Sequence, residues 1–239
     1  MKKDSKLKIR AAALLLAATS TFTLVGCSRE RTPDESYDTL VQADGEEFTG
    51  SLTQVLDVKN NNFKLVANYS TDERTYRSWR ITSDKFLYID VHTEGLDANT
   101  EVYIDNVHID TSLKSDYAIV DGIKQDTMDD HVHSSNLIGF AIDNNTHYYG
   151  IDQIEGYNDE FINATTYAYN GFASTTITNE RITEKQYIDK LAVTGNKISI
   201  VYDLLIKKPE DKDFANVSVK SDFVVDITDK EKENGVQKV

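Results

Sequence analysis

Apolar and polar residues alternate along much of the chain, with the period of two that sends successive side chains to opposite faces of a strand. Leu87, Ile89 and Val91 alternate in this way with polar or aromatic neighbours. Residues 197–206 (KISIVYDLLI) form an apolar run that is typical of a buried strand. Shorter runs rich in residues that favour strands lie at 63–69 and 76–82.

Two expected strands carry an irregularity. Every second residue from Val217 to Ile227 is apolar except Ser221, which predicts one long strand with a single polar residue on its buried face. In residues 101–110 (EVYIDNVHID) the apolar positions change phase between Ile104 and Val107. A regular strand keeps each face constant, so this change predicts a tight turn or a β-bulge.

One short helix is expected in the segment ITNERITEKQYIDKLAVTGNK. Thr183 is a suitable N-cap, and Gln186 follows at the spacing of a capping box. Ile188 and Leu191 would face the core, and Gly195 would end the segment. With about seven to nine strands and this helix, the pattern predicts an all-β fold, an antiparallel β-sandwich that is immunoglobulin-like in broad layout. Trp79 is expected to anchor its core.

The N-terminus has a different pattern. The first ten residues carry five Lys/Arg, and residues 11–26 carry no charge, which is typical of a secretory signal. As a helix the uncharged run would reach about 24 Å, less than the ~30 Å hydrocarbon core of a bilayer. Leu24-Val25-Gly26-Cys27 resembles the lipobox of bacterial lipoproteins. The resemblance implies that the thiol of Cys27, the only cysteine, receives a covalent diacylglycerol, and that the leader is then cut off so that Cys27 becomes the new N-terminus. Residues 20–26 also resemble peptide pheromones that enterococci cut from lipoprotein leaders.

The expected organisation has four parts: a signal peptide at 1–26, the lipidated Cys27 with a polar tether at 27–47, a β-sandwich body at 48–228, and a polar tail at 229–239. Residues 1–26 hold five of the 26 Lys/Arg and one of the 40 Asp/Glu, so the remainder carries a net charge of −18. Such a charge repels phosphate backbones and argues against a nucleic-acid partner. No cofactor is expected besides the lipid.

The segment DDHVH contains the residues with the clearest metal-binding spacing. His131 and His133 would share one face of a strand, and Asp129 could add a carboxylate. The alternative is a polar loop with solvated side chains. A closed site also needs a third and a fourth ligand. His92, His108 and His147 are possible candidates, but spacing supports none of them. The segment DNNTH, from Asp143, begins like a calcium loop but lacks the turn glycine and the bidentate glutamate, so a turn stabilised by Asp and Asn side chains is expected.

Aromatic residues gather between 148 and 172 and form a candidate binding face: Tyr148, Tyr149, Tyr157, Tyr167, Tyr169 and Phe172. Such clusters suit recognition of proteins or glycans. The alternative is ordinary packing, because Tyr167 and Tyr169 alternate as they would on a strand.

These features predict a non-catalytic, lipid-anchored, extracytoplasmic binding protein of the bacterial cell envelope, attached to the membrane by its lipid and recognising a protein or envelope component. The chain has no nucleophile elbow, Ser-x-x-Lys box or glycine-rich phosphate loop, so no enzyme is expected. The alternative is a metal-binding protein or metal-dependent envelope enzyme that uses DDHVH. Residues 101–130 resemble lipoproteins of low-GC Gram-positive bacteria, and the Lys- and Asn-rich composition favours that envelope type.

Overall fold

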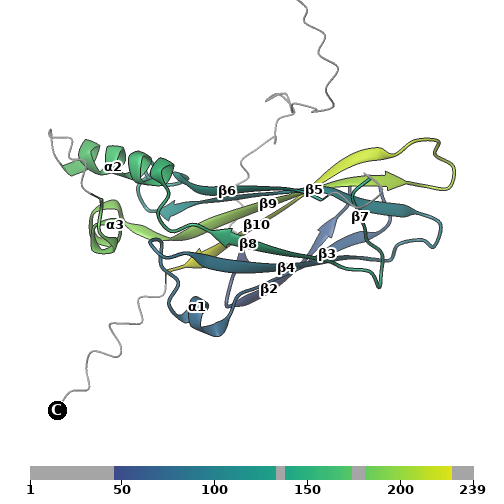
Figure 1. Cartoon of the computed structure of the whole chain (residues 1–239), viewed down its shortest axis with the longest axis horizontal. Coiled ribbons are helices and arrows are strands. Elements are labelled where there is room, and N and C mark those ends of the chain that lie inside the picture. Colours follow the sequence, from purple (N-terminus) through teal and green to yellow (C-terminus); the bar gives the residue numbers. More distant parts are fainter. Residues whose placement is uncertain (1–45, 133–137, 174–180, 228–239) are drawn as a thin grey trace, which may run out of the picture. The chain divides into compact units, whose positions relative to one another are not determined.

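The computed structural model describes residues 46–132, 138–173 and 181–227, and these form an all-β sandwich of two sheets, as the sequence predicts (Figure 1). The four-stranded sheet has the order β2-β3-β4-β8 and consists of β2 (Ser51–Asp57), β3 (Lys64–Ser70), β4 (Lys85–Glu94) and β8 (Tyr148–Ile154). Each pair of adjacent strands in this sheet is antiparallel.

The six-stranded sheet has the order β1-β10-β9-β5-β6, and β7 pairs with β5. It consists of β1 (Glu46–Glu47), β10 (Ala215–Asp226), β9 (Val193–Lys207), β5 (Glu101–Ser115), β6 (Lys124–His131) and β7 (Phe140–Ala141). Only the short pairing of β1 with β10 is parallel among the described strands. Residues 46–47, placed at the end of the tether by the sequence pattern, therefore already belong to this sheet.

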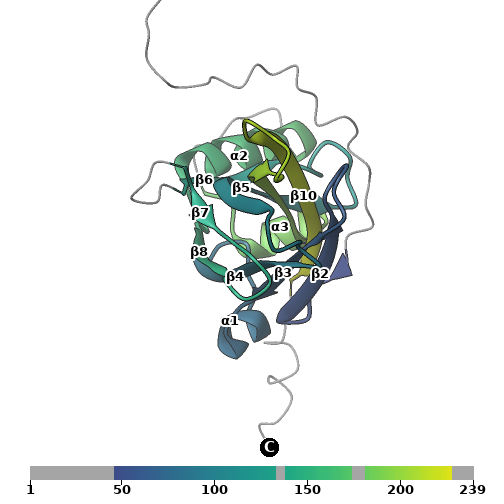
Figure 2. The same cartoon turned by 90° about the vertical axis from the view of Figure 1, so that its right-hand side faces the viewer.

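The core lies between the two sheets (Figure 2). Leu87, Ile89 and Val91 of β4 are buried, as their alternation predicts. Phe223 and Val225 of β10 meet them from the other sheet as part of the same apolar cluster. Burial of these faces is the main force that holds two sheets together, because each sheet can remove one face from water only by packing on the other.

Ser221, the one polar residue on the buried face of β10, has a structural explanation. Its hydroxyl accepts a hydrogen bond of 2.7 Å from the Tyr69 hydroxyl of β3. The Tyr69 hydroxyl also lies 2.9 Å from that of Tyr202 on β9. Burial raises the pKa of Tyr69 to about 12. These neutral hydroxyl groups satisfy one another inside the core and link the two sheets.

The phase change in β5 is a bulge rather than a turn. β5 continues from Glu101 to Ser115, and its register with β9 shifts between Ile104 and Asn106. Ile104 before the shift and Val107 after it are both buried. One additional residue in the strand therefore keeps the apolar side chains on the core face.

The predicted helix is present as α3 (Glu184–Leu191). Thr183 and Gln186 form the expected capping box, and Leu191 is buried. The helix ends earlier than predicted, at Ala192 in the left-handed conformation, and Gly195 lies within β9. Tyr187, rather than the half-buried Ile188, supplies the second buried side chain.

The prediction of a strand is wrong for two segments. Residues 76–82 include the end of α1 (Glu73–Arg77) and the loop after it, because Asp72 caps that helix through the backbone N–H of Thr75 at 2.9 Å. Tyr167 and Tyr169 lie in α2 (Asp159–Ala173), where Asn158 accepts a hydrogen bond of 2.7 Å from the Phe161 N–H. A local side-chain cap therefore outweighs the strand preference of both segments.

α2 and α3 enclose a second, smaller core beside the end of β5 (Figure 1). Phe161 of α2 and Tyr187 of α3 stack with ring centroids 5.7 Å apart. Leu113 of β5 joins the same cluster. Among the described helices none has the length and apolar character that crossing a membrane requires.

Candidate functional site

The outer face of the four-stranded sheet exposes large apolar side chains. They alternate with the core residues of their strands, so they point away from the other sheet. Tyr149 is 73% exposed and Ile151 is 62% exposed. The exposed set, called here the outer face, consists of Val55, Phe86, Tyr88, Tyr149 and Ile151. Register places Tyr88 directly opposite Ile151, so part of this set is contiguous across β4 and β8.

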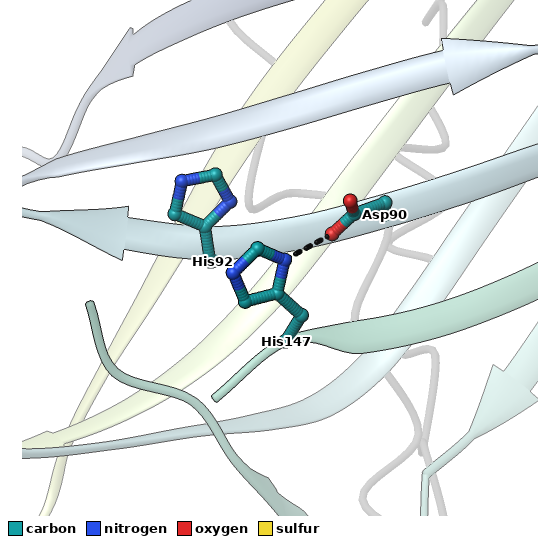
Figure 3. Close-up of side chains that lie close together, drawn as sticks. All are labelled: Asp90, His92 and His147. Carbon is teal, nitrogen blue, oxygen red and sulfur yellow. Dashed lines mark hydrogen bonds and ion pairs between the residues drawn. The ribbon is translucent and has the colours of Figure 1, made fainter. Parts of the chain in front are cut away.

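A cluster of two histidines and one aspartate lies on the same side of this sheet (Figure 3). Asp90 and His92 are two residues apart on β4, and their side chains therefore point to the same side of the strand, away from the core. β4 pairs with β8 so that Asp90 faces Tyr149, and the same register continued places His147 opposite His92. One ligand atom from each of the three side chains lies within 4.8 Å of the other two.

Hydrogen bonds and ring contacts define the present arrangement of this cluster. His147 Nδ1 lies 2.7 Å from Asp90 Oδ1. The His92 and His147 rings stack, with centroids 4.1 Å apart and an interplanar angle of 11°. His92 Nδ1 is buried and has no hydrogen-bond partner among the described residues. A buried polar atom without a partner is costly, so a ligand that binds it would be favoured.

A turn before β8 positions His147. The Asp143 carboxylate accepts hydrogen bonds of 2.7 Å from the backbone N–H groups of Asn145 and Thr146. The Asn144 side chain lies 3.3 Å from Thr93 Oγ1 and so joins this turn to β4. The segment DNNTH is therefore the Asx-type turn that the sequence predicts, and it presents His147 to β4.

The segment predicted to bind metal lies elsewhere. Asp129 is on β6, and its Oδ1 lies 2.7 Å from His108 Nδ1 of β5. His131 is exposed at the end of β6. His133 lies outside the described residues. Within the described part of the chain, Asp129 and His131 do not belong to a group of three convergent ligands, and a site that includes His133 stays a prediction.

His108 has carboxylates at both ring nitrogens. Its Nε2 lies 3.0 Å from Asp110 Oδ2, on the side of the ring opposite to Asp129. The hydrogen bonds that His108 donates to Asp110 and, secondarily, to Asp129 raise the pKa of His108, while the same contact lowers the pKa of Asp110. The two carboxylates stabilise the imidazolium ring but cannot converge with it on one ion, because the ring separates them.

The aromatic residues predicted to form one binding face are distributed over several environments. Tyr149 alone lies on the outer face. Tyr148 is buried and donates to Asp130 Oδ2 at 2.8 Å, and Tyr157 donates to the Ile182 carbonyl. Tyr167 is exposed on α2, and Tyr169 accepts a hydrogen bond from Gln186. Phe172 is in α2, but its side chain is outside the described part.

A hollow of about 650 Å³ lies beside α1 and includes Trp79 and Lys85 in its lining. Burial lowers the pKa of the Lys85 amine to about 7. Burial and the nearby charge of Asp126 raise the pKa of Asp152 on β8 to about 7. Lys85 Nζ donates to the Ser83 carbonyl at 2.8 Å. Burial of these ionisable groups lowers the stability of the fold. No nucleophile is paired with a base among them, so they do not have the arrangement of a reaction centre.

No protein-family model, curated protein or solved structure matches the chain. Cys27 lies outside the described residues.

The Asp90–His92–His147 cluster was missed from sequence although half of its signal was visible. Asp90-Val91-His92 has the same spacing on a strand as His131 and His133. The third ligand is 55 residues further on, and only the pairing of β4 with β8 brings it near.

Proposed function

We propose that the protein is a lipid-anchored, extracytoplasmic binding protein of the bacterial cell envelope that acts without catalysis and recognises a protein partner through the outer face. One observation carries this proposal: five large apolar side chains are exposed on one side of a single sheet. Exposed apolar side chains that lie together mark interaction surfaces, whereas single scattered ones are common on any protein surface.

The chemistry of the outer face favours a protein over other partners. Tyr and Phe are enriched in the buried centres of protein interfaces, where they provide area at little entropic cost. The net charge of −18 beyond residue 26 disfavours anionic surfaces and nucleic acids. We therefore infer a partner with a neutral or basic rim around an apolar patch.

The anchor part of the proposal rests on the sequence of the leader. A basic start, an uncharged run, the lipobox-like Leu24–Cys27 and a polar stretch follow in the order found in bacterial lipoproteins. Two acyl chains hold a protein stably on a bilayer, whereas one gives only marginal binding. A Gram-positive envelope is the proposed setting.

Replacing Cys27 with alanine tests the anchor. In a bacterial host fed an alkyne-tagged fatty acid, we expect the wild-type protein to carry the label and to sediment with membranes. Cys27→Ala should lose the label entirely, because no other thiol exists in the chain. Ser28→Ala is the matched control and should keep it. Label that persists in Cys27→Ala would exclude Cys27 as the lipidation site.

A photo-crosslinking amino acid at position 149 tests the outer face. Tyr149 and Tyr167 are both exposed, at 73% and 78%, but Tyr167 lies on α2 and serves as the matched control. On intact cells we expect discrete adducts from position 149 and not from 167. Ile151→Asp should reduce the adducts at least about tenfold, since it puts a charge into the apolar centre.

Equal yields at both positions would contradict the proposal. Sedimentation of the purified protein separates self-association from binding of another protein.

A further inference from the structure

We propose that Asp90, His92 and His147 form a binding site for one divalent first-row metal ion, and we expect this ion to be Zn²⁺. This inference does not rest on the lipid anchor or on the protein partner, although the site adjoins the outer face, where the Tyr149 ring stacks on that of His147 with centroids 5.9 Å apart. It rests on three side chains of metal-binding type whose ligand atoms lie within 4.8 Å of one another, and on the framework that holds them.

Strand pairing and a hydrogen-bonded turn hold the backbone of the three residues in place. Two ligands sit on one face of β4, which is hydrogen-bonded on both sides, to β3 and to β8. The third is fixed by the Asp143 turn immediately before β8. Sites on regular strands hold ligands more accurately than sites on loops do. The backbone therefore brings the three residues together before any ion binds.

Only side-chain rotations separate this arrangement from a coordinated one. Zn–N and Zn–O bonds are about 2.0–2.2 Å, which places ligand atoms roughly 3.3 Å apart around a tetrahedral ion. His147 Nδ1 and Asp90 Oδ1 are already 2.7 Å apart. The His92 and His147 rings are nearly parallel, so a nitrogen of each must turn towards a common centre. Binding thus replaces a ring stack with two metal–nitrogen bonds.

The donor set determines the class of ion. Two imidazoles and one carboxylate suit zinc and other late first-row divalent ions, whereas Ca²⁺ and Mg²⁺ prefer oxygen ligands alone. The side chains of Asp90 and His147 are 32% and 26% exposed, so solvent reaches the cluster. Three protein ligands beside solvent leave at least one position for water or for a donor from another molecule.

The cluster around His108 shows why proximity alone is insufficient and supplies a matched control. It too combines a histidine with carboxylates on neighbouring strands. Its two aspartates bond opposite nitrogens of one ring, so no single point lies near all three groups. His108→Gln removes a histidine between carboxylates without removing a proposed ligand.

Calorimetric titration of the full-length protein in detergent with ZnCl₂ tests the site. Every sample carries Cys27→Ser, because a free thiol would itself bind zinc. We expect one ion per chain for the parent and for His108→Gln. His147→Gln and Asp90→Asn should each weaken binding at least about tenfold. The parent and His108→Gln should both show a zinc-dependent rise in Tm, and this rise should be smaller in the two ligand variants. Circular dichroism of each variant without zinc establishes that it is folded.

Two results would overturn the proposal. One is a parent protein that binds no zinc, or that binds it as tightly as His147→Gln does. The other is loss of binding in a His131→Gln, His133→Gln double variant while Asp90→Asn binds normally, which would move the site to the DDHVH segment. Visible absorption of bound Co²⁺ gives a second readout, because its spectrum changes when an imidazole ligand is lost.

Discussion

Trp79→Ala is expected to lower the free energy of unfolding by about 3–5 kcal/mol. Trp79 is fully buried and packs near Phe48, with ring centroids 6.4 Å apart. Its Nε1–H donates to Asn196 Oδ1 at 2.9 Å, and Asn196 Nδ2 donates to Gln125 Oε1 at 2.8 Å. Truncation therefore leaves a large cavity and also removes a donor from a buried polar chain, and both changes are costly.

Urea unfolding followed by far-UV circular dichroism measures this effect. Fluorescence is unsuitable because Trp79 is the only tryptophan. Trp79→Phe is the informative control: it keeps an aromatic ring but not the N–H, so we expect a loss of about 1–3 kcal/mol. A loss below about 1 kcal/mol for the alanine variant would contradict the placement of Trp79 as the core anchor.

Lys85→Met is expected to have the opposite sign and to raise the free energy of unfolding at pH 7 and below by about 3 kcal/mol. The ordinary amine pKa of 10.5 falls to about 7 because burial disfavours the charge, although Asp84, Glu184 and Asp126 oppose the shift. At ~1.36 kcal/mol per unit the penalty is at most about 5 kcal/mol. The lost hydrogen bond to the Ser83 carbonyl offsets about 1–2 kcal/mol of the gain.

The pH dependence gives this prediction a definite sign. Between about pH 7 and 10 the unfolded chain keeps the Lys85 proton while the folded protein releases it. The unfolded state then binds more protons, so the stability of the wild-type protein rises with pH through this window. Below pH 7 both states are protonated and the full penalty remains. The advantage of Lys85→Met should therefore be largest at or below pH 7 and should decrease towards pH 10.

Chemical unfolding of both proteins at several pH values provides the measurement. Lys64→Met is the matched control, because Lys64 is an exposed lysine that pairs with Asp57 on the outside of the sheet. Its effect should stay within about 0.5 kcal/mol at every pH. Destabilisation by Lys85→Met, or an advantage that grows with pH, would show that the buried amine is stabilised by its neighbours.

Much of the fold follows from local pattern. The alternation of Leu87, Ile89 and Val91 requires a strand with one buried face, and β4 has it. The capping residues Thr183 and Gln186 mark the start of α3 because they satisfy backbone groups within one turn. The change of phase after Ile104 correctly indicates an irregularity, and of the two predicted alternatives, a tight turn or a bulge, the structure has the bulge. These signals operate over a few residues, so they can be recognised without knowing what packs against them.

The errors in the predicted elements arise where a helix cap or a neighbour distant in the sequence outweighs the local strand pattern. Tyr167 and Tyr169 alternate as on a strand, yet the Asn158 cap and the apolar contacts of Phe161 stabilise a helix. Residues 76–82 contain Trp79 and Ile81, which are buried without belonging to a strand. Residues distant in the sequence help to hold them there, because Gln125 of β6 donates to the Ile81 carbonyl and Trp79 donates to Asn196 of β9.

The sequence by itself determined the layered β architecture, the capped helix, the acidic character and the charge pattern of residues 1–27, because period, caps and charge are properties of short segments. Only the tertiary structure decided which polar residues meet. Asp90 and His92 were visible as a pair, but His147 joins them through the register of β4 with β8. Likewise the outer face exists because Tyr88 and Ile151 lie on paired strands. Register depends on the whole core, since a shift of one residue would turn every side chain of a strand to the opposite face.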